Sequence, residues 1–300
     1  MATATLLSGT ELARGLVGDA TERASSFAAE HGRRPCLATV LVGDDPASAT
    51  YVCMKANRCR TAGVDSRAVV LPASSTTAEV VARVTQLSDD PMVDGILVQH
   101  PVPPQVDERA VFEAIAPGKD VDGVTMHSFA AMALGEPGFA SCTPGGILRL
   151  LDAHGIELEG RHAVVIGRSP ILGKPVGMLL LARDATVTYC HSRTRDLPAI
   201  VRTADLVVAA VGIARFVRGD WLRPGSVVID AGYNDGTIGD VHFEEAAAVA
   251  SAITPVPGGV GPMTIATLLS QTVDAAIAHA GPDRAEEPRR APGRPLSTLP

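Results

Sequence analysis

Aromatic residues are scarce in this sequence. They make up 3% of the 300 residues, although 46% of all residues are hydrophobic. A core must therefore be built mainly from Ala, Val, Leu and Ile. Charged residues make up 20%, which is in the range of an ordinary globular protein. A chain of this length is long enough for two domains of roughly 100–200 residues each.

The cysteines form no CxxC pair and are odd in number: Cys36, Cys53, Cys59, Cys142 and Cys190. Both a disulfide framework and a zinc site are disfavoured, and no metal is expected. The first eight residues lack the basic and apolar regions of a signal peptide. Together these features predict a cytoplasmic protein.

Long apolar runs are also missing. None approaches the roughly 20 residues that a membrane span requires. The net charge is −7, which disfavours a general surface for nucleic acid or anionic lipid. We therefore expect no nucleic-acid partner and no membrane partner. A small anionic molecule can still bind in a local basic pocket.

The sequence does contain an alternation of short apolar runs with helical patterns. Strands are expected at 36–42, 68–71, 95–99, 162–166, 185–190, 205–211, 226–230 and 252–255. Helices are expected at 10–31, 47–62, 77–88, 108–114, 145–153, 174–182 and 262–280. Several strands are almost wholly apolar, as strands buried on both faces of a parallel sheet should be. The alternation predicts an α/β fold.

The order of these elements predicts two domains. One is expected to comprise residues 1–140 plus 262–281, because the last helix is expected to pack back on the first block. The other, residues 141–261, is expected to be Rossmann-like with a parallel sheet. Residues 282–300 are rich in Pro, Arg, Ala and Ser and have few apolar side chains. Such a segment buries too little surface to offset its ordering entropy, and we expect a disordered tail.

A glycine-containing loop follows the strand at 162–166. It begins Gly167-Arg168-Ser169, and a helical pattern starts at Lys174. Glycine lets a backbone turn tightly against a pyrophosphate, and a helix N-terminus supplies free N–H groups. The segment is not GxGxxG, so an ordinary strand-to-helix turn remains the alternative.

The end of the next strand bears on the cofactor. NAD sites usually have an acid there, whereas NADP sites use cationic groups. This strand end has no acid but carries Ser192 and Arg193. Arg168 and Arg193 can meet a 2′-phosphate with Ser192 as a donor, although Arg193 can also be a solvated surface charge. The pattern favours NADP over NAD. Gly212 and Tyr233 follow two further strands, at positions that line ligands in doubly wound sheets.

A second group of candidate site residues lies in the first block. Tyr51 and Lys55 are four residues apart on one expected helix and share a face. A lysine on a helix is most often a solvated charge. Gln99, however, ends an apolar strand at an edge where sites form, and Asp120 and Asp122 share a turn. Turn or helix capping is the alternative role for these two acids.

The segment 254–264 is unusually constrained, with three prolines and three glycines among its residues. Proline fixes φ, and glycine permits unusual φ values and close backbone approach. We interpret the loop as shaped for a ligand, with Pro257, Gly258 and Gly259 as substrate-binding residues.

Taken together, these motifs resemble those of bifunctional methylenetetrahydrofolate dehydrogenase/methenyltetrahydrofolate cyclohydrolases. The matching segments are TYVCMK (50–55), DGILVQHPVP (94–103), APGKDVDGV (116–124), CTPGG (142–146), VVIGRSPILGKPVGMLLL (164–181), YCHSRT (189–194) and ITPVPGGVGPMT (253–264). They run in family order from about residue 5 to residue 280.

The resemblance implies a homodimer with a cleft between a folate domain and an NADP domain. It implies NADP-dependent oxidation of 5,10-methylenetetrahydrofolate to the methenyl form, followed by hydrolysis to 10-formyltetrahydrofolate. It also implies that Lys55 is the catalytic lysine, that Tyr51 packs along the folate, that Gln99 lies beside the lysine, and that Asp122 binds the pterin. The residues at family cofactor positions are Gly167, Arg168, Ser169, Ser192 and Tyr233.

Two departures from the family pattern concern the substrate cleft. His100 stands where the family usually has Leu, and residues 126–130 stand where it often has an Asn and a Gly. One rival interpretation is a dehydrogenase of the same fold that prefers NAD or lacks the second activity. Another is a non-catalytic folate- or nucleotide-binding protein. Lys55 and Gln99 argue against loss of the hydrolytic step, in which we expect Lys55 to transfer protons.

Overall fold

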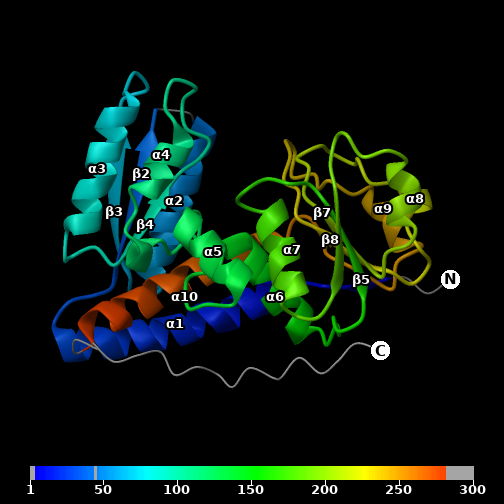
Figure 1. Cartoon of the computed structure of the whole chain (residues 1–300). Helices are drawn as coiled ribbons and strands as arrows, with labels where there is room; N and C mark the ends of the chain where they lie inside the picture. The colour runs from blue at the N-terminus through cyan, green and yellow to red at the C-terminus, as the bar shows by residue number, and fades with distance from the viewer. Residues whose placement is uncertain (1–3, 44–45, 282–300) are drawn as a thin grey trace, which may run out of the picture.

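The computed structural model describes residues 4–43 and 46–281, with the backbone alone described for residues 46–53. Two parallel sheets organise the chain, and two long helices, α1 (Thr10–His31) and α10 (Val260–Ala280), run along the base of the molecule in Figure 1. The predicted α/β fold is confirmed. The expected tail at 282–300 lies outside the described residues.

The smaller sheet has the strand order β3-β2-β4. Its strands are β2 (Cys36–Val42), β3 (Asp65–Leu71) and β4 (Gly95–Val98), and its helices are α2 (Pro46–Thr61), α3 (Thr77–Asp89) and α4 (Glu108–Glu113). Val40 of the central strand pairs with Val69 on one side and Val98 on the other. Successive β2 residues face opposite ways, so Leu37 and Ala38 join different buried clusters. Both faces of β2 are therefore covered.

The larger sheet has the order β1-β9-β8-β7-β5-β6, and all its pairings are parallel. Its strands are β1 (Thr5–Leu6), β5 (His162–Ile166), β6 (Thr186–Cys190), β7 (Leu206–Ala209), β8 (Val227–Asp230) and β9 (Ala252–Ile253). Val165 and Val164 belong to clusters on opposite faces. This two-sided burial explains the continuous apolar runs in the sequence.

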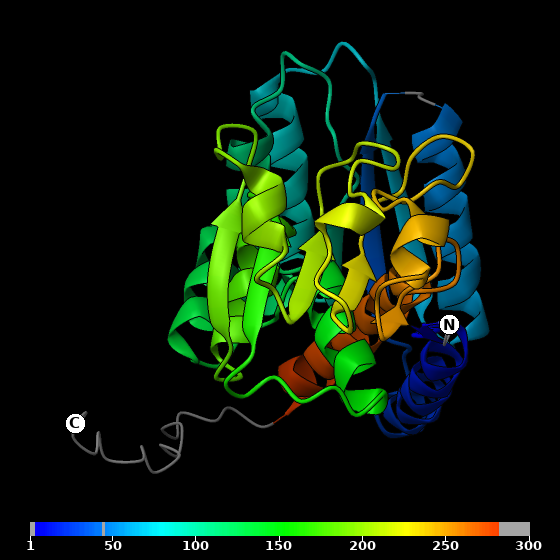
Figure 2. The ribbon, with the colours of Figure 1, turned by 90° about the vertical axis from the view of Figure 1, so that its right-hand side faces the viewer.

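Helices α1 and α10 pack side by side, and Figure 2 shows both in the lower half of the molecule, α10 (orange-red) running obliquely and α1 (blue) at the lower right. Small residues at the contact, including Ala20 and Ala24, are fully buried, which lets the helix backbones approach closely. Arg23 of α1 is held by Asp274 and by Ser270 Oγ of α10, the latter at 2.9 Å. Helix α10 also packs on α6 (Cys142–Ala153). The last helix thus returns to the first part of the chain.

Several short elements are not among those expected from the sequence. They are β1, α5 (Met126–Leu134), α8 (Leu197–Val201), α9 (Phe243–Ala247), and the 3-10 turns at Pro117–Lys119 and Gly219–Trp221. Most span fewer than six residues, too few to display a helical or strand period. Strand β3 begins three residues before the expected strand because its exposed first half is polar. None of the helices in the described part of the chain has the length and apolarity needed to cross a membrane.

Candidate active site

Lys55 and Gln99 come together at the carboxyl edge of the smaller sheet. Lys55 Nζ donates a hydrogen bond of 2.9 Å to Gln99 Oε1. Gln99 continues the β4 ladder, since its backbone N–H donates to Val40 O at 2.8 Å. Its side-chain nitrogen donates to His100 O at 3.1 Å. Because the amide nitrogen is committed to that carbonyl, the amide oxygen faces the lysine.

Burial and charge act against each other at Lys55. The side chain is half-buried, and this desolvation lowers the pKa of its ammonium group, while the negative charge of Asp122 opposes the shift. Burial in turn raises the pKa of the Asp122 carboxyl, and the charges on Lys55 and His100 oppose that rise. Lys55 and Asp122 therefore interact electrostatically in one partly desolvated space. His100, a departure from the family pattern, contributes to the electrostatic field at the same acid.

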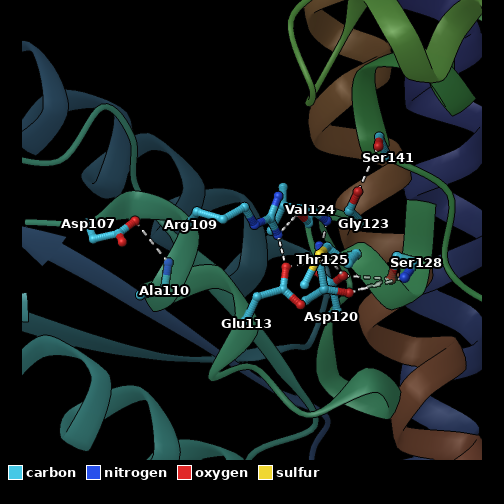
Figure 3. Close-up of polar contacts among 11 residues, drawn as sticks. Asp107, Arg109, Ala110, Glu113, Asp120, Gly123, Val124, Thr125, Ser128 and Ser141 are labelled. Carbon is cyan, nitrogen blue, oxygen red and sulfur yellow. Dashed lines mark hydrogen bonds and ion pairs between the residues drawn. The ribbon is translucent and has the colours of Figure 1, made fainter. Parts of the chain in front are cut away.

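The two acids of the turn at 120–122 have different surroundings. Asp120 is fully buried and accepts hydrogen bonds from Val124 N at 3.0 Å, Thr125 N at 2.9 Å and Ser128 Oγ at 2.6 Å (Figure 3). These bonds close the turn and fix the start of α5. Asp120 therefore has the capping role that the sequence left open for both acids, and Asp122 remains to face Lys55.

Three distant residues hold the backbone around Asp122. Cys142 N donates to Asp122 O at 3.2 Å, and Ser141 Oγ donates to Gly123 O at 2.7 Å, a contact drawn in Figure 3. Gln271 Nε2 donates to Val121 O at 2.7 Å from helix α10. No local pattern in the sequence points to Ser141 or Gln271, because only the packing of α6 and α10 brings them to this turn.

The structure describes the segment 126–130 in full, but only the backbone of Tyr51. Tyr51 lies on helix α2, but its side chain is outside the described part of the structure. The departing segment 126–130 forms the first half of α5. Thr125 caps this helix by accepting from Ser128 N, and Gly135 closes it in the left-handed conformation. These two capping residues are the signals from which α5 could have been predicted.

The loop after β5 is built by close backbone approach. Gly167 has φ 131°, and a Cβ there would lie 2.1 Å from Ala210 O. A Cβ on Gly173 would lie 2.5 Å from Gly167 O. Glycine is therefore required at both positions, and the loop presents bare backbone where a pyrophosphate would approach.

The N-terminus of helix α7 (Gly173–Leu181) differs from the sequence expectation of free N–H groups. Ser169 Oγ accepts from Leu172 N and Gly173 N, each at 3.2 Å, and Ser169 O accepts from Lys174 N at 3.0 Å. The next residue, Pro175, has no N–H. Ser169 thus satisfies N–H groups at the start of the helix from within the chain, and these amides are not free for an external anion.

The cationic groups expected near a 2′-phosphate follow adjacent strands. Ile166 of β5 pairs with Cys190 of β6, so Arg168 and Arg193 emerge from neighbouring positions at one sheet edge. Both are exposed, as is Ser192, and neither arginine pairs with an acid within residues 4–43 and 46–281. Two uncommitted guanidinium groups and a hydroxyl form a donor set that fits the 2′-phosphate of NADP.

The other predicted ligand residues lie in loops at strand ends. Gly212 follows β7 with φ 66°, and Tyr233, a residue that is 62% exposed, follows β8. After β9, Gly258 O accepts from Gly9 N at 2.8 Å, which ties the loop to the start of α1. Pro257 is exposed, and Gly259 is buried with no space for a Cβ beside Pro255 O. These contacts hold a fixed loop shape.

Comparison with known proteins identifies relatives over nearly the whole chain. The family model for the catalytic domain of tetrahydrofolate dehydrogenase/cyclohydrolase matches residues 7–122, and the model for its NAD(P)-binding domain matches residues 141–280. The chain is 65% identical over 279 residues to bifunctional protein FolD 1 of Streptomyces avermitilis, which covers 93% of this chain and 97% of that protein.

Solved structures of members of the same family also match this chain. The bifunctional enzyme FolD of Campylobacter jejuni is 43% identical with a TM-score of 0.89, and the match covers 92% of this chain and 99% of that chain. The Trypanosoma brucei methylenetetrahydrofolate dehydrogenase-cyclohydrolase, crystallised with NADP cofactor and an inhibitor, is 35% identical with a TM-score of 0.88. That match covers 93% of this chain and 99% of that chain.

Proposed function

The chain belongs to the tetrahydrofolate dehydrogenase/cyclohydrolase family, and from that premise we propose that Lys55 carries the proton transfers of the hydrolytic step. The enzyme oxidises 5,10-methylenetetrahydrofolate with NADP and hydrolyses the resulting methenyl compound to 10-formyltetrahydrofolate. The observation that carries the proposal is the hydrogen bond from Lys55 Nζ to Gln99 Oε1, together with the desolvation of the lysine.

A neutral amine is needed at the start of hydrolysis. As the water oxygen bonds to the methenyl carbon, a proton of that water passes to Lys55 Nζ. The protonated lysine then returns that proton to the ring nitrogen as the bond between this nitrogen and the carbon breaks. The formyl C=O forms in the same step, and the remaining hydroxyl proton leaves to solvent, so that one proton is released overall. Burial lowers the pKa of Lys55 and so increases the neutral fraction. Gln99 does not titrate, and its role is to orient the lysine through its amide oxygen.

Substrate binding is proposed to use the other residues of the cleft. Asp122 is an acceptor when ionised and suits the amino and ring N–H groups of the pterin. Tyr51 is proposed to pack along the folate. Pro257, Gly258 and Gly259 are proposed to shape the end of the cleft near the second domain. This loop is supported by its constrained backbone and its bond to Gly9.

The cofactor belongs at the carboxyl edge of the larger sheet. NADP, when bound there, accepts the hydride of the methylene carbon. Gly167 and Ser169 are proposed to shape the loop beneath the pyrophosphate, and Gly212 and Tyr233 to line the same edge. Arg168, Ser192 and Arg193 are proposed to hold the 2′-phosphate. The protein's contribution to hydride transfer is then the alignment of donor and acceptor.

The pH dependence of wild-type hydrolysis tests the role of Lys55. With methenyltetrahydrofolate as substrate and the buffer background subtracted, kcat is expected to rise with pH through an ionisation below 10.5, the usual value for lysine. A kcat that falls as pH rises through this range would contradict a basic role. In a second assay, methylenetetrahydrofolate is oxidised with NADP or, in a parallel run, with NAD, and the decay of methenyl absorbance is then followed. This assay separates the bifunctional enzyme from a monofunctional or NAD-preferring one.

A homodimer is proposed on the evidence of strand β3. This edge strand of the smaller sheet exposes most of its residues, including Val70, which is 64% exposed. An exposed strand edge with unpaired backbone groups is suited to pairing with a second chain. Light scattering is expected to give twice the mass of the chain, and Val70→Lys is expected to shift the protein toward monomer. A monomeric wild-type protein at micromolar concentration would contradict the proposal.

The domain division and compartment are also proposals. Residues 1–140 with 262–281 are proposed as the folate domain and residues 141–261 as the NADP domain, supported by the packing of α10 on α1. Limited proteolysis is expected to cut first in the exposed segment 135–138, just before the proposed boundary at residue 141. A cytoplasmic location is supported by the free thiols of the four described cysteines, and fractionation of the native cells tests it.

A further inference from the structure

Two loops proposed to line NADP lie next to each other at the edge of the larger sheet. One follows β7 and contains Gly212, and the other follows β8 and contains Tyr233. The strands are neighbours, with Ala209 paired to Asp230. The segment that follows the second loop returns to the sheet and places Asp240 between the two.

Asp240 is fully buried and accepts four hydrogen bonds. Its Oδ2 accepts from Val211 N at 2.6 Å and Gly212 N at 2.8 Å. Its Oδ1 accepts from Ile213 N at 3.0 Å and from Asn234 Nδ2 at 3.0 Å. Three consecutive amides of the first loop and one side chain of the second therefore end on a single carboxylate.

A second buried acid fixes the position of Asp240. Asp230 Oδ1 accepts from Asp240 N at 2.8 Å and Gly232 N at 3.0 Å, and its Oδ2 accepts from Val241 N at 2.9 Å. The backbone packs closely against both carboxylates, which leaves them no space to move. A Cβ on Gly232 would lie 2.2 Å from Asp240 Oδ1, and one on Gly239 would lie 1.9 Å from Asp230 Oδ2. The carboxylate of Asp240 is held in one place.

The other side of the first loop is open. Gly212 has φ 66°, and no atom lies within 4 Å of the position of an added Cβ. The amides of residues 211–213 turn inward to Asp240, so the bare side of Gly212 is left for a ligand. The buried Asp240 carboxylate thus fixes the conformation of the loop at 211–213, including the face that Gly212 turns to the ligand.

We propose that Asp240 is a positioning residue for NADP, which fixes the loop at 211–213 relative to the loop that carries Tyr233. The proposal rests on the proposed placement of the cofactor against Gly212 and Tyr233. A carboxylate suits this role because it offers only acceptors, whereas an amide would turn an NH₂ group toward two of the four donors. Leaving buried donors unpaired favours a different loop conformation.

Asp240→Asn tests the inference, and the enzyme provides its own control. Hydrolysis of methenyltetrahydrofolate does not consume NADP, so it reports whether the folate domain and the overall fold are intact. The variant is expected to raise the KM for NADP and its Kd by calorimetry about tenfold, because buried donors of the loop lose their partner and the loop no longer keeps the shape that the cofactor meets. The kcat for methenyltetrahydrofolate hydrolysis is expected to stay within about twofold of wild type.

Two further variants complete the test. Asp235→Asn removes the same charge from an exposed position in the same loop and is expected to leave the KM for NADP unchanged. Asn234→Ala removes a single donor to Asp240 and is expected to raise the KM for NADP by a smaller factor. This variant tests the inference if Asp240→Asn does not fold.

Unchanged NADP binding in a folded Asp240→Asn variant would overturn the inference, and so would unchanged binding in Asn234→Ala if Asp240→Asn does not fold. An equal loss of both activities in a folded variant would overturn it as well. A wild-type enzyme that fails to bind NADP would instead overturn the proposed function.

Discussion

Gln99 presents its side-chain oxygen to Lys55 Nζ at 2.9 Å while its side-chain nitrogen donates to His100 O at 3.1 Å. The second bond settles the orientation of the amide, and the first directs the lysine. A lysine that reaches a fixed neutral acceptor keeps its position in both protonation states. This geometry suits a group that accepts a proton and then returns it.

Replacing Gln99 is expected to move the pH profile of hydrolysis in a direction set by charge. Gln99→Glu places an anion beside Nζ, which raises the pKa of Lys55 and moves the inflection in kcat to higher pH. Gln99→Leu removes the acceptor that stabilises the ammonium form and moves it to lower pH. At pH 7 the kcat of the Glu variant is expected to fall about tenfold for every pH unit by which the inflection rises. Identical inflections in the two variants would contradict the coupling.

Asp122→Asn is expected to move the inflection to lower pH and to raise the KM for methenyltetrahydrofolate. The reason is that the Asp122 charge opposes the lowering of the pKa of Lys55, and removing it lowers that pKa further. Asp120→Asn is the matched control. Because Asp120 accepts three bonds that close its turn, its loss is expected to lower Tm and leave the inflection in place. An unmoved inflection in Asp122→Asn argues against its proximity to Lys55.

Arg168→Gln and Arg193→Gln are each expected to raise the KM for NADP about tenfold, since a charge-assisted hydrogen bond contributes roughly 1.5–3 kcal/mol. The KM for NAD, which lacks the 2′-phosphate, is expected to change by less than about twofold. Initial rates with both cofactors measure this difference. Equal effects on the two cofactors would rule out recognition of the 2′-phosphate by these residues.

Arg33 and Asp94 form a partly buried ion pair that is expected to stabilise the part of the chain built on the smaller sheet. Arg33 donates to both carboxylate oxygens of Asp94, at 2.7 and 2.8 Å, and Asp94 is fully buried. Arg33→Ala leaves the buried Asp94 carboxylate with only the hydrogen bond from Cys36 N and the longer contact with His279, and is expected to lower the free energy of unfolding by up to about 3 kcal/mol. The control is Arg34→Ala, whose contact with Asp65 is 3.9 Å long and exposed, with an expected loss below about 0.5 kcal/mol. Urea unfolding gives both values.

The stabilisation by the Arg33–Asp94 pair is expected to be lost at acid pH. Burial alone would raise the pKa of Asp94, yet hydrogen bonds from Arg33 and from Cys36 N, with His279 nearby at 3.7 Å, hold it below its usual value of 3.8. Its stabilising contribution is therefore complete above that value and is lost as pH falls through the lower, folded-state pKa. In Arg33→Ala this acid-side loss is expected to begin at higher pH. Wild type and variant losing stability over the same pH range would contradict it.

Much of the fold could be predicted because both faces of the larger sheet are buried. Val164 and Val165 point opposite ways into different clusters, so β5 reads as a continuous apolar run with no polar alternation. The exposed half of β3 lacks that signal, and the pattern therefore does not indicate where the strand starts. Helix α5 escapes prediction because its start coincides with a departure from the family pattern, although Thr125 and Gly135 mark its ends.

The candidate site could be predicted only in its parts. The spacing of Tyr51 and Lys55 indicates a shared helix face, but which acid of the turn faces the lysine depends on three bonds that only Asp120 receives. The same holds for the loop after β5, where Ser169 satisfies the amides that the sequence suggests for a phosphate. The local sequence pattern indicates which residues are candidates, whereas the hydrogen bonds that they form depend on the tertiary structure.

The most direct test of the role of Lys55 is the hydrolysis of methenyltetrahydrofolate by Lys55→Met. Methionine matches much of the length of lysine but cannot accept or return a proton. The variant is expected to lose hydrolysis by at least about 100-fold, the usual contribution of general acid–base catalysis, while its Kd for NADP stays within about twofold of wild type. A folded Lys55→Met enzyme that hydrolyses methenyltetrahydrofolate at the wild-type rate would contradict the central role given to this lysine.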